Sequence, residues 1–200
     1  CGICSLVCPC GTIAYEKGEK PTVNEKARCM GCGQCDAFCP MHAVSCDFPG
    51  DYPVHNYDDV ADVTPKQLAK YLQKRRSIRS YKNAPVPKET MNEIFDIVRY
   101  APTGGNFQSI HWVVLSGEEK LNKLTKLVIE WFRGFLENAP ETPYTPVFKG
   151  LVAAYDAGHN VITWGAPHLV SVATDEQAIS GDADGIIAMS WFEIALNSFG

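Results

Sequence analysis

The sequence predicts an α+β protein with two parts, a small cysteine-rich part followed by a larger part of mixed helices and strands. Three observations predict this division. All nine cysteines fall within the first 46 of the 200 residues. Residues 47–63 hold prolines, a glycine and acidic residues without an apolar period, which is typical of a linker. The rest mixes helical and strand patterns without a strict strand–helix–strand repeat. We therefore expect domains at 1–48 and 64–200, joined by a linker at 49–63.

Four cysteines of the first part have the spacing of iron–sulfur ligands. Cys29, Cys32, Cys35 and Cys39 are separated by two, two and three residues, and Pro40 follows at once. This segment resembles bacterial ferredoxins, in which three cysteines of such a run bind one cluster and the fourth binds the other. The run therefore predicts two [4Fe-4S] clusters and an electron-transfer role.

The first residues repeat the end of the same pattern. Cys1, Cys4 and Cys8 are followed by Pro9, and the cysteine that would open the run has no counterpart. We therefore expect that the sequence begins inside a longer motif. The resemblance to ferredoxins implies two ligand sets, which we call cluster A and cluster B. Cluster A would use Cys1, Cys4, Cys39 and one ligand outside this sequence, and cluster B would use Cys8, Cys29, Cys32 and Cys35.

Two other uses of cysteine fit the sequence less well. A zinc ribbon needs two Cys-x2-Cys pairs and not two triple runs ending in Cys-Pro. A disulfide scaffold would not confine its cysteines to one end of the chain. Cys10 and Cys46 lie outside both runs, and we expect them to be small buried thiols, with a substitute fourth ligand as the alternative.

Charge and hydropathy exclude several classes of function. Residues 1–62 carry four Lys or Arg against nine Asp or Glu, whereas residues 63–200 carry fourteen of each. Nucleic-acid binding is not expected, because it needs a basic face. No apolar run is long enough to span a membrane. Because clusters need a reducing compartment, we expect a cytoplasmic protein from an organism that lives with little oxygen.

The larger part has elements that can be taken in chain order. Thr64 and Pro65 predict a helix start with an N-cap residue and a proline in the first turn, followed by apolar Leu68, Tyr71 and Leu72. After it we expect a helix at 87–100, a buried strand at 112–115, a long amphipathic helix at 118–138, a buried strand at 169–173 and an apolar helix at 184–198. The segment 138–164, with three prolines, is expected to be a loop or a lid.

Two motifs in this part suggest a bound phosphate and a bound aromatic ring. Arg75, Arg76, Ser77 and Arg79 offer planar guanidinium donors and a hydroxyl, which suit a phosphate monoester, although a basic helix end would look the same. The stretch Ala-Pro-Thr-Gly-Gly-Asn-Phe-Gln at 101–108 ends a predicted helix. Its two amide side chains can donate to and accept from the edge of a flavin ring.

These two motifs, with Gly-Ala-Pro-His at 165–168, resemble the nitroreductase family of flavoproteins in order and spacing. The resemblance covers roughly residues 65–200 and implies an α+β fold, a homodimer and FMN at the dimer interface. It also implies that Arg75, Arg76, Ser77 and Arg79 hold the FMN phosphate and ribityl chain, and that Asn106 with Gln108 contacts the ring. Later loops of that family would lie beyond residue 200, so we expect further sequence at the C-terminal side too.

Together, the two parts predict an iron–sulfur flavoprotein. A low-potential electron donor would reduce the clusters, the clusters would reduce FMN, and FMN would reduce a nitroaromatic, a quinone or another conjugated small molecule. No separate catalytic side chain is expected, because the flavin carries the chemistry. Two alternatives remain open: an electron-transfer subunit that relays electrons to a partner protein, and an enzyme for one specific substrate with 138–164 as its lid.

Overall fold

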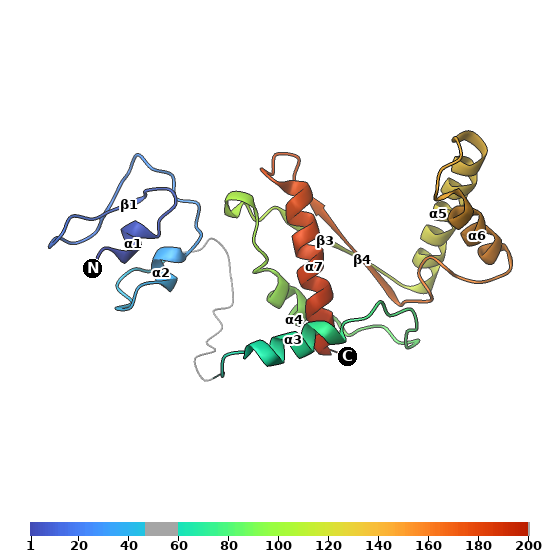
Figure 1. Ribbon diagram of the computed structural model, residues 1–200, viewed down its shortest axis with the longest axis horizontal. Coiled ribbons are helices and arrows are strands. Elements are labelled where there is room, and N and C mark those ends of the chain that lie inside the picture. Colours follow the sequence, from blue (N-terminus) through green and yellow to red (C-terminus); the bar gives the residue numbers. More distant parts are fainter. Residues whose placement is uncertain (47–59, 200) are drawn as a thin grey trace.

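The computed structural model describes residues 1–46 and 60–199, which Figure 1 shows as ribbons. The expected linker at 49–63 lies almost wholly outside the described residues. In the N-terminal part, two short helices flank a two-stranded antiparallel sheet. These elements are α1 (Ile3–Leu6), β1 (Ile13–Ala14), β2 (Thr22–Val23) and α2 (Gln34–Ala37).

The two short helices begin in the same way, which reflects the repeated cysteine run. Gly2 precedes α1 and Gly33 precedes α2, and both have left-handed backbone conformations, with φ of 84° and 69°. Glycine adopts this conformation without the steric cost that a Cβ would impose. At Gly2 a Cβ would also lie 2.6 Å from the ring of Tyr15. Each glycine therefore turns the chain between two cysteines of its run.

The larger part contains five α-helices, a short 3-10 turn and a second two-stranded sheet among the described residues. The helices are α3 (Pro65–Lys74), α4 (Lys88–Val98), α5 (Glu118–Asn138), α6 (Thr145–Asp156) and α7 (Gly181–Phe199), and the 3-10 turn is η1 (Gly104–Asn106). The strands are β3 (Ile110–Ser116) and β4 (His168–Thr174). They pair antiparallel along their whole length, from Ile110 opposite Thr174 to Ser116 opposite His168.

The hydrophobic core lies where α4 and α7 meet the sheet. Ile94 and Val98 from α4 pack with Phe192 from α7, and all three side chains are buried. Phe95 and Trp112 extend this core, with ring centroids 5.3 Å apart. These residues of α4 recur at helical spacing, so a single face of the helix packs into the core. Because α7 runs across the sheet, this core fixes the helix against β4.

The segment 138–164 is not the loop expected from its prolines. It contains α6, which begins at Thr145 with Pro146 in its first turn, where a proline does not break a helix. Helix α6 packs against α5, with the rings of Phe132 and Phe148 stacked at a centroid distance of 4.6 Å. In Figure 1 this pair of helices projects from the rest of the chain.

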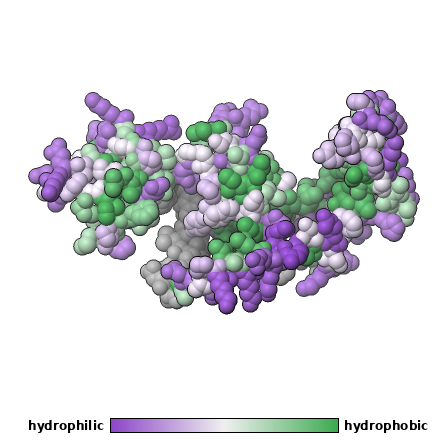
Figure 2. Space-filling view, viewed as in Figure 1, coloured by the Kyte–Doolittle hydropathy of each residue, from purple (hydrophilic) through white to green (hydrophobic). Residues whose placement is uncertain are grey.

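The strands are less buried than their β-branched sequences suggested. Val113 and Val114 of β3 are 46% and 36% exposed, because a sheet of two strands has few neighbours to cover it. The described chain exposes 15129 Å² in all. A compact monomer of 22.0 kDa would expose roughly 9,300 Å² by the usual size scaling. Figure 2 shows hydrophobic surface both around the central body and on the α5–α6 projection.

Helix α3 leads directly into the basic run, and its start is capped as predicted. The Thr64 hydroxyl accepts from the backbone N–H of Gln67, and the Gln67 side chain accepts in turn from the N–H of Thr64. The apolar side chains of Leu68 and Leu72, at 49% and 44% exposure, contribute no buried core. The cap fixes the start of this helix, while Tyr71 and Arg75 tie its end to α7.

Replacing Thr64 with alanine removes the oxygen that caps α3. We expect Thr64→Ala to lower the free energy of unfolding by about 1 kcal/mol, measured by urea titration. Thr64→Ser is the matched control, because serine keeps the acceptor oxygen and should stay near the parent value. Equal stability of both variants would show that the cap does not hold the helix.

Candidate functional site

The cysteines of the N-terminal part surround a small cavity. Its volume is about 190 Å³. The cysteines that line it are the four expected for cluster B together with the two outside the runs: Cys8, Cys29, Cys32, Cys35, Cys10 and Cys46. Among residues 1–46 and 60–199, no three His, Cys, Asp or Glu side chains converge to hold a single metal ion. The donor set nevertheless suits a cluster, because each cysteine of a cubane binds a different iron and the sulfurs stay apart.

Backbone N–H groups point at three of the cysteine sulfurs. The N–H of Thr12 donates to Cys8 Sγ at 3.3 Å and that of Gly31 to Cys29 Sγ at 3.3 Å. Among the cysteines expected for cluster A, Cys39 Sγ accepts from the N–H of Ala43 at 3.2 Å. Such hydrogen bonds stabilise thiolate and tune the potential of a bound cluster.

The pKa values of Cys8 and Cys39 follow these hydrogen bonds. Burial alone would raise the pKa of Cys8, but backbone N–H groups around it, with Thr12 first, lower the pKa below its usual value. The N–H groups of Ala43 and Met41 lower the pKa of Cys39. Both shifts favour the thiolate form, which is the form that binds iron.

Cys46 is a half-buried thiol. Burial and its neighbour Cys35 raise the pKa of Cys46 to about 11. The two sulfurs are 3.5 Å apart, and the N–H of Cys46 donates to the Asp36 carboxylate. Cys46 lines the cavity as expected, but it is half-buried where the sequence predicted a buried thiol.

The cysteines expected for cluster A come from both short helices. Cys4 is buried within α1, whereas Cys1 precedes α1 and is exposed. Cys39 follows α2 by two residues and is half-buried, and α1 packs against α2. The packing of these helices places residues from both runs in one small unit.

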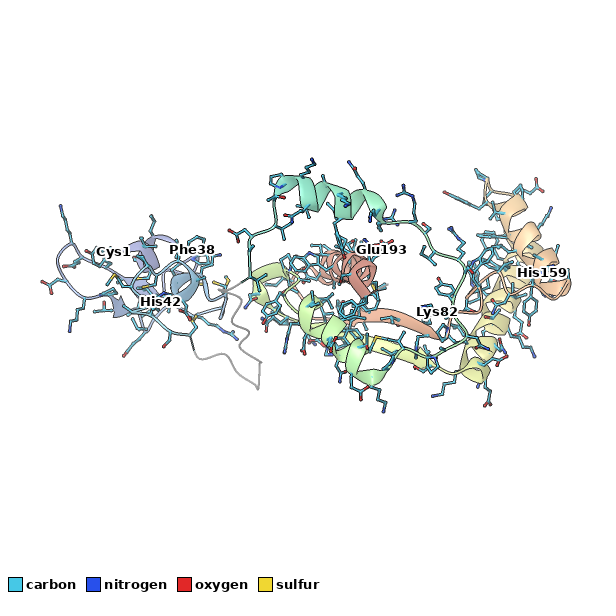
Figure 3. All side chains as sticks on the ribbon, turned by 90° about the horizontal axis from the view of Figure 1, so that it is seen from below. Cys1, Phe38, His42, Lys82, His159 and Glu193 are labelled. Carbon is cyan, nitrogen blue, oxygen red and sulfur yellow. The ribbon has the colours of Figure 1, made fainter. Side chains whose placement is uncertain are left out.

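The basic run begins where α3 ends, and its first arginine contacts the C-terminal half of α7. Arg75 donates to the Glu193 carboxylate at 2.8 Å, which ties the start of the run to α7. Figure 3 shows Glu193 on α7 on the side that faces α3. The Arg76 guanidinium donates to the carbonyls of Gln73 and Arg75, and Arg79 donates weakly to that of Ser77. Both side chains are exposed, and neither belongs to an ion pair within the described part of the chain.

The Ala-Pro-Thr loop at 101–108 lies at the opposite end of α7. The N–H of Gly104 donates to the carboxylate of Asp184 at 2.9 Å. Asp184 is 2% exposed, and its second oxygen has no hydrogen-bond partner among the described residues. A Cβ at Gly104 would lie 2.8 Å from the Ser180 hydroxyl, so glycine permits this close approach.

The side chain of Asn106 joins the two parts of the chain. Its amide nitrogen donates to the carbonyls of Met30 and Gly31, each at 3.0 Å. Its oxygen accepts from the amide of Gln108 at 3.4 Å. The backbone of Asn106 has a φ of 54°, in the left-handed region that asparagine tolerates better than most residues. The structure thus brings Asn106 to the cysteine loop, a contact that the sequence did not predict.

A groove of about 640 Å³ runs along α7 beside β4. Its wall is mostly apolar, with Glu193 near one end and Thr174 near the other: it includes Val172, Gly185, Ile186, Met189, Phe192 and Leu196. From Asp184 to Glu193 the helix rises about 14 Å. Arg75 therefore lies at one end of α7, and the Gly104 loop lies at the other.

His168 binds the segment that follows the basic run. The sequence did not predict this contact. Its Nε2 accepts from the N–H of Val86 at 2.8 Å, so Nδ1 carries the proton and donates to Ser116 Oγ at 2.7 Å. These bonds fasten the chain before α4 to the paired ends of β3 and β4. The motif residue His168 therefore has a structural role here.

The helices and the paired strands form an α+β domain, with one of the two sequence motifs near each end of α7. The chain belongs to the nitroreductase family, whose sequence model matches residues 72–200. A similar curated protein is 4-nitrobenzoate reductase of a Nocardioides species, 33% identical over 72 residues. That match covers 36% of this chain and 29% of the relative.

Two further comparisons agree with this family. Chloronitrobenzene nitroreductase of Comamonas testosteroni is 33% identical over 76 residues, covering 38% of this chain and 33% of that protein. The matched segments thus span about a third or less of the curated relatives. A nitroreductase of Desulfitobacterium hafniense, solved with FMN bound, superposes with a TM-score of 0.53 at 21% identity, over 66% of this chain and 65% of that one. This likeness shows the same fold.

None of the helices that the structure describes combines the length and the apolar character needed to cross a membrane.

Proposed function

We propose that this chain is an iron–sulfur flavoprotein oxidoreductase, in which two [4Fe-4S] clusters feed electrons to FMN and FMN reduces a conjugated small molecule. The observation that supports this most is the pair of hydrogen bonds from Asn106 to Met30 and Gly31. It joins the loop between two expected cluster ligands to the expected flavin-contacting loop. A path for electrons needs such an approach between the two parts.

The cysteines hold the electron input of this proposal. Cys8, Cys29, Cys32 and Cys35 bind cluster B around their shared cavity, and Cys1, Cys4 and Cys39 contribute to cluster A. The N–H groups on the sulfurs of Cys8, Cys29 and Cys39 stabilise the thiolates. The donor is a low-potential electron carrier, which suits the potentials of such clusters.

The flavin site extends along α7 in this proposal. FMN supplies one-electron and two-electron chemistry when it is bound. Arg76, Ser77 and Arg79 bind its phosphate, while Arg75 stays in its ion pair and anchors the run. Phosphate and ring lie at opposite ends of an extended ribityl chain, which fits motifs at opposite ends of a helix. The apolar groove beside β4 has a volume in the usual range for a cofactor site.

The ring lies toward the Ala-Pro-Thr loop in this proposal. The amide N–H groups of Asn106 donate to Met30 and Gly31 and are not available to the flavin ring. Asn106 therefore helps to form the flavin site by fixing the position of its loop. Gln108 is exposed and bonds only weakly to Asn106, which leaves its amide available to the ring edge. The acceptor is a nitroaromatic, as the names of the two relatives suggest, or another conjugated molecule such as a quinone.

A second copy of this chain completes the site in our proposal. The described chain exposes far more surface than its mass requires, and α7 shows apolar side chains on the face away from its core. Ile186 is 69% exposed, Trp191 40% and Ile194 38%. Obligate dimers bury large apolar faces of this kind.

Replacing Trp191 by aspartate places a charge on this face. We expect Trp191→Asp to weaken the dimer by at least roughly tenfold, as judged by sedimentation over a range of concentrations. Val147→Asp on α6 is the control, because it introduces the same charge at another exposed apolar site. An unchanged dimer in Trp191→Asp would place the interface elsewhere.

Reconstitution tests the proposed function. The chain is supplied with iron, sulfide and FMN under anaerobic conditions and mixed with a reduced low-potential carrier protein. We expect the flavin absorbance to fall as electrons arrive through the clusters, and a nitroaromatic to restore it. Flavin that stays oxidised while the clusters are reduced and reoxidised would contradict the proposal.

A further inference from the structure

The hydrogen bonds of the Asn106 side chain use both of its N–H donors. Both amide protons go to backbone carbonyls of Met30 and Gly31, and the oxygen accepts from Gln108. A primary amide has two N–H donors, so none is left for another acceptor. The side chain is half-buried between the loops, where such bonds are worth more than on an open surface.

A hydrogen bond to α7 holds the loop that carries Asn106. The carboxylate of Asp184, buried in the first turn of α7, accepts from the N–H of Gly104. Gly105 and Asn106 both have left-handed conformations, with φ of 59° and 54°. A continuous set of hydrogen bonds thus runs from α7 through the Gly104–Asn106 turn to Met30.

The residues that receive these bonds belong to one cysteine run. Met30 and Gly31 lie between Cys29 and Cys32, which are expected ligands of cluster B and line its cavity. Within the described residues, these two bonds are the hydrogen bonds recorded between 1–46 and 60–199. No hydrogen bond from the larger part reaches Cys1, Cys4 or Cys39 in that same set.

We infer that Asn106 is a positioning residue that docks the Cys29–Cys32 loop onto the larger part, which makes cluster B the electron exit and cluster A the electron input. This inference rests on the proposed function. With both clusters and FMN bound, cluster A would take one electron from the low-potential donor, cluster B would take one from cluster A, and FMN would take one from cluster B. Two such transfers, with two protons from water, would give the two-electron-reduced flavin.

Hydrogen exchange tests the docking in the full chain. Asn106→Ala removes both donors, and we expect the amides of residues 29–35 to exchange roughly tenfold faster, with the peptide around Cys1 and Cys4 unchanged. Asn138→Ala on α5 is the matched control. That asparagine also donates to a backbone carbonyl, but the carbonyl belongs to α5 itself and not to the cysteine run. Equal exchange of residues 29–35 in the parent and in Asn106→Ala would overturn the docking.

Redox titration of the reconstituted chain tests the order of the clusters. Asn106→Asp keeps the shape of the side chain but replaces its two donors by a carboxylate. We expect it to shift the midpoint potential of the cluster that is lost in Cys32→Ser, and to leave the cluster that is lost in Cys4→Ser unchanged. A shift of the other cluster, of both or of neither would overturn the order. A chain that takes up no iron would end the proposed function as well, whereas the exchange result would still decide the docking.

Discussion

Serine at position 32 should cost the reconstituted protein one of its two clusters. Cys32 lines the shared cavity, and its neighbours along the run, Cys29 and Cys35, line the same cavity. A serine hydroxyl is a poor substitute for a thiolate because it does not ionise near neutral pH. In a protein that also supplies the fourth ligand of cluster A, we expect Cys32→Ser to bind about half of the iron and sulfide of the parent, measured by chemical analysis and by cluster absorbance.

The matched control for this loss is Cys10→Ser. Cys10 lines the same cavity but lies outside both cysteine runs, so iron and sulfide should stay near the parent level. Equal iron in the parent and in Cys32→Ser would contradict the ligand assignment. A loss in Cys10→Ser that matched the loss in Cys32→Ser would identify Cys10 as a ligand.

Removal of the two exposed guanidinium groups should greatly weaken FMN binding. Arg76 and Arg79 carry no ion pair among the described residues, so a phosphate would gain their donors without breaking one. A hydrogen bond from a charged donor is worth about 1.5–3 kcal/mol. Because these side chains are exposed, we take the lower value for each. The double variant Arg76→Ala/Arg79→Ala should then raise the Kd for FMN about 100-fold, measured by flavin fluorescence.

Arg133→Ala serves as the control for this measurement. Arg133 is also exposed, and it pairs with Asp156 across α5 and α6, away from the groove along α7. An exposed pair of this kind contributes little to stability, so FMN should bind this variant as it binds the parent. The double variant binding FMN with the parent's Kd would exclude the basic run as the phosphate site.

Much of the fold was predictable because its elements carry strong local signals. The long helix at 118–138 was predicted to the residue, since its apolar positions repeat with helical spacing over five turns. The cap at Thr64 was predicted from Pro65 and the apolar residues that follow. Strand ends were correct within one or two residues, and the structure extends both strands on both sides.

The remaining features depend on contacts that local patterns do not contain. Three prolines concealed α6, because a proline in the first turn looks the same in sequence as one that prevents a helix. Exposure of Val113 was missed because it depends on how many strands the sheet has. The asparagine of the Ala-Pro-Thr loop carried a flavin signature, but its bonds to Met30 and Gly31 join residues 75 and 76 positions apart.

An absorption spectrum of the reconstituted chain, taken with its iron and flavin content, tests the central claim most directly. If one chain holds both kinds of cofactor, the spectrum should show a broad band at roughly 400 nm beneath the structured peaks of a flavin. Reduced carrier protein should then bleach both features. A chain that shows flavin peaks without iron, or that stays colourless after reconstitution, would contradict the account.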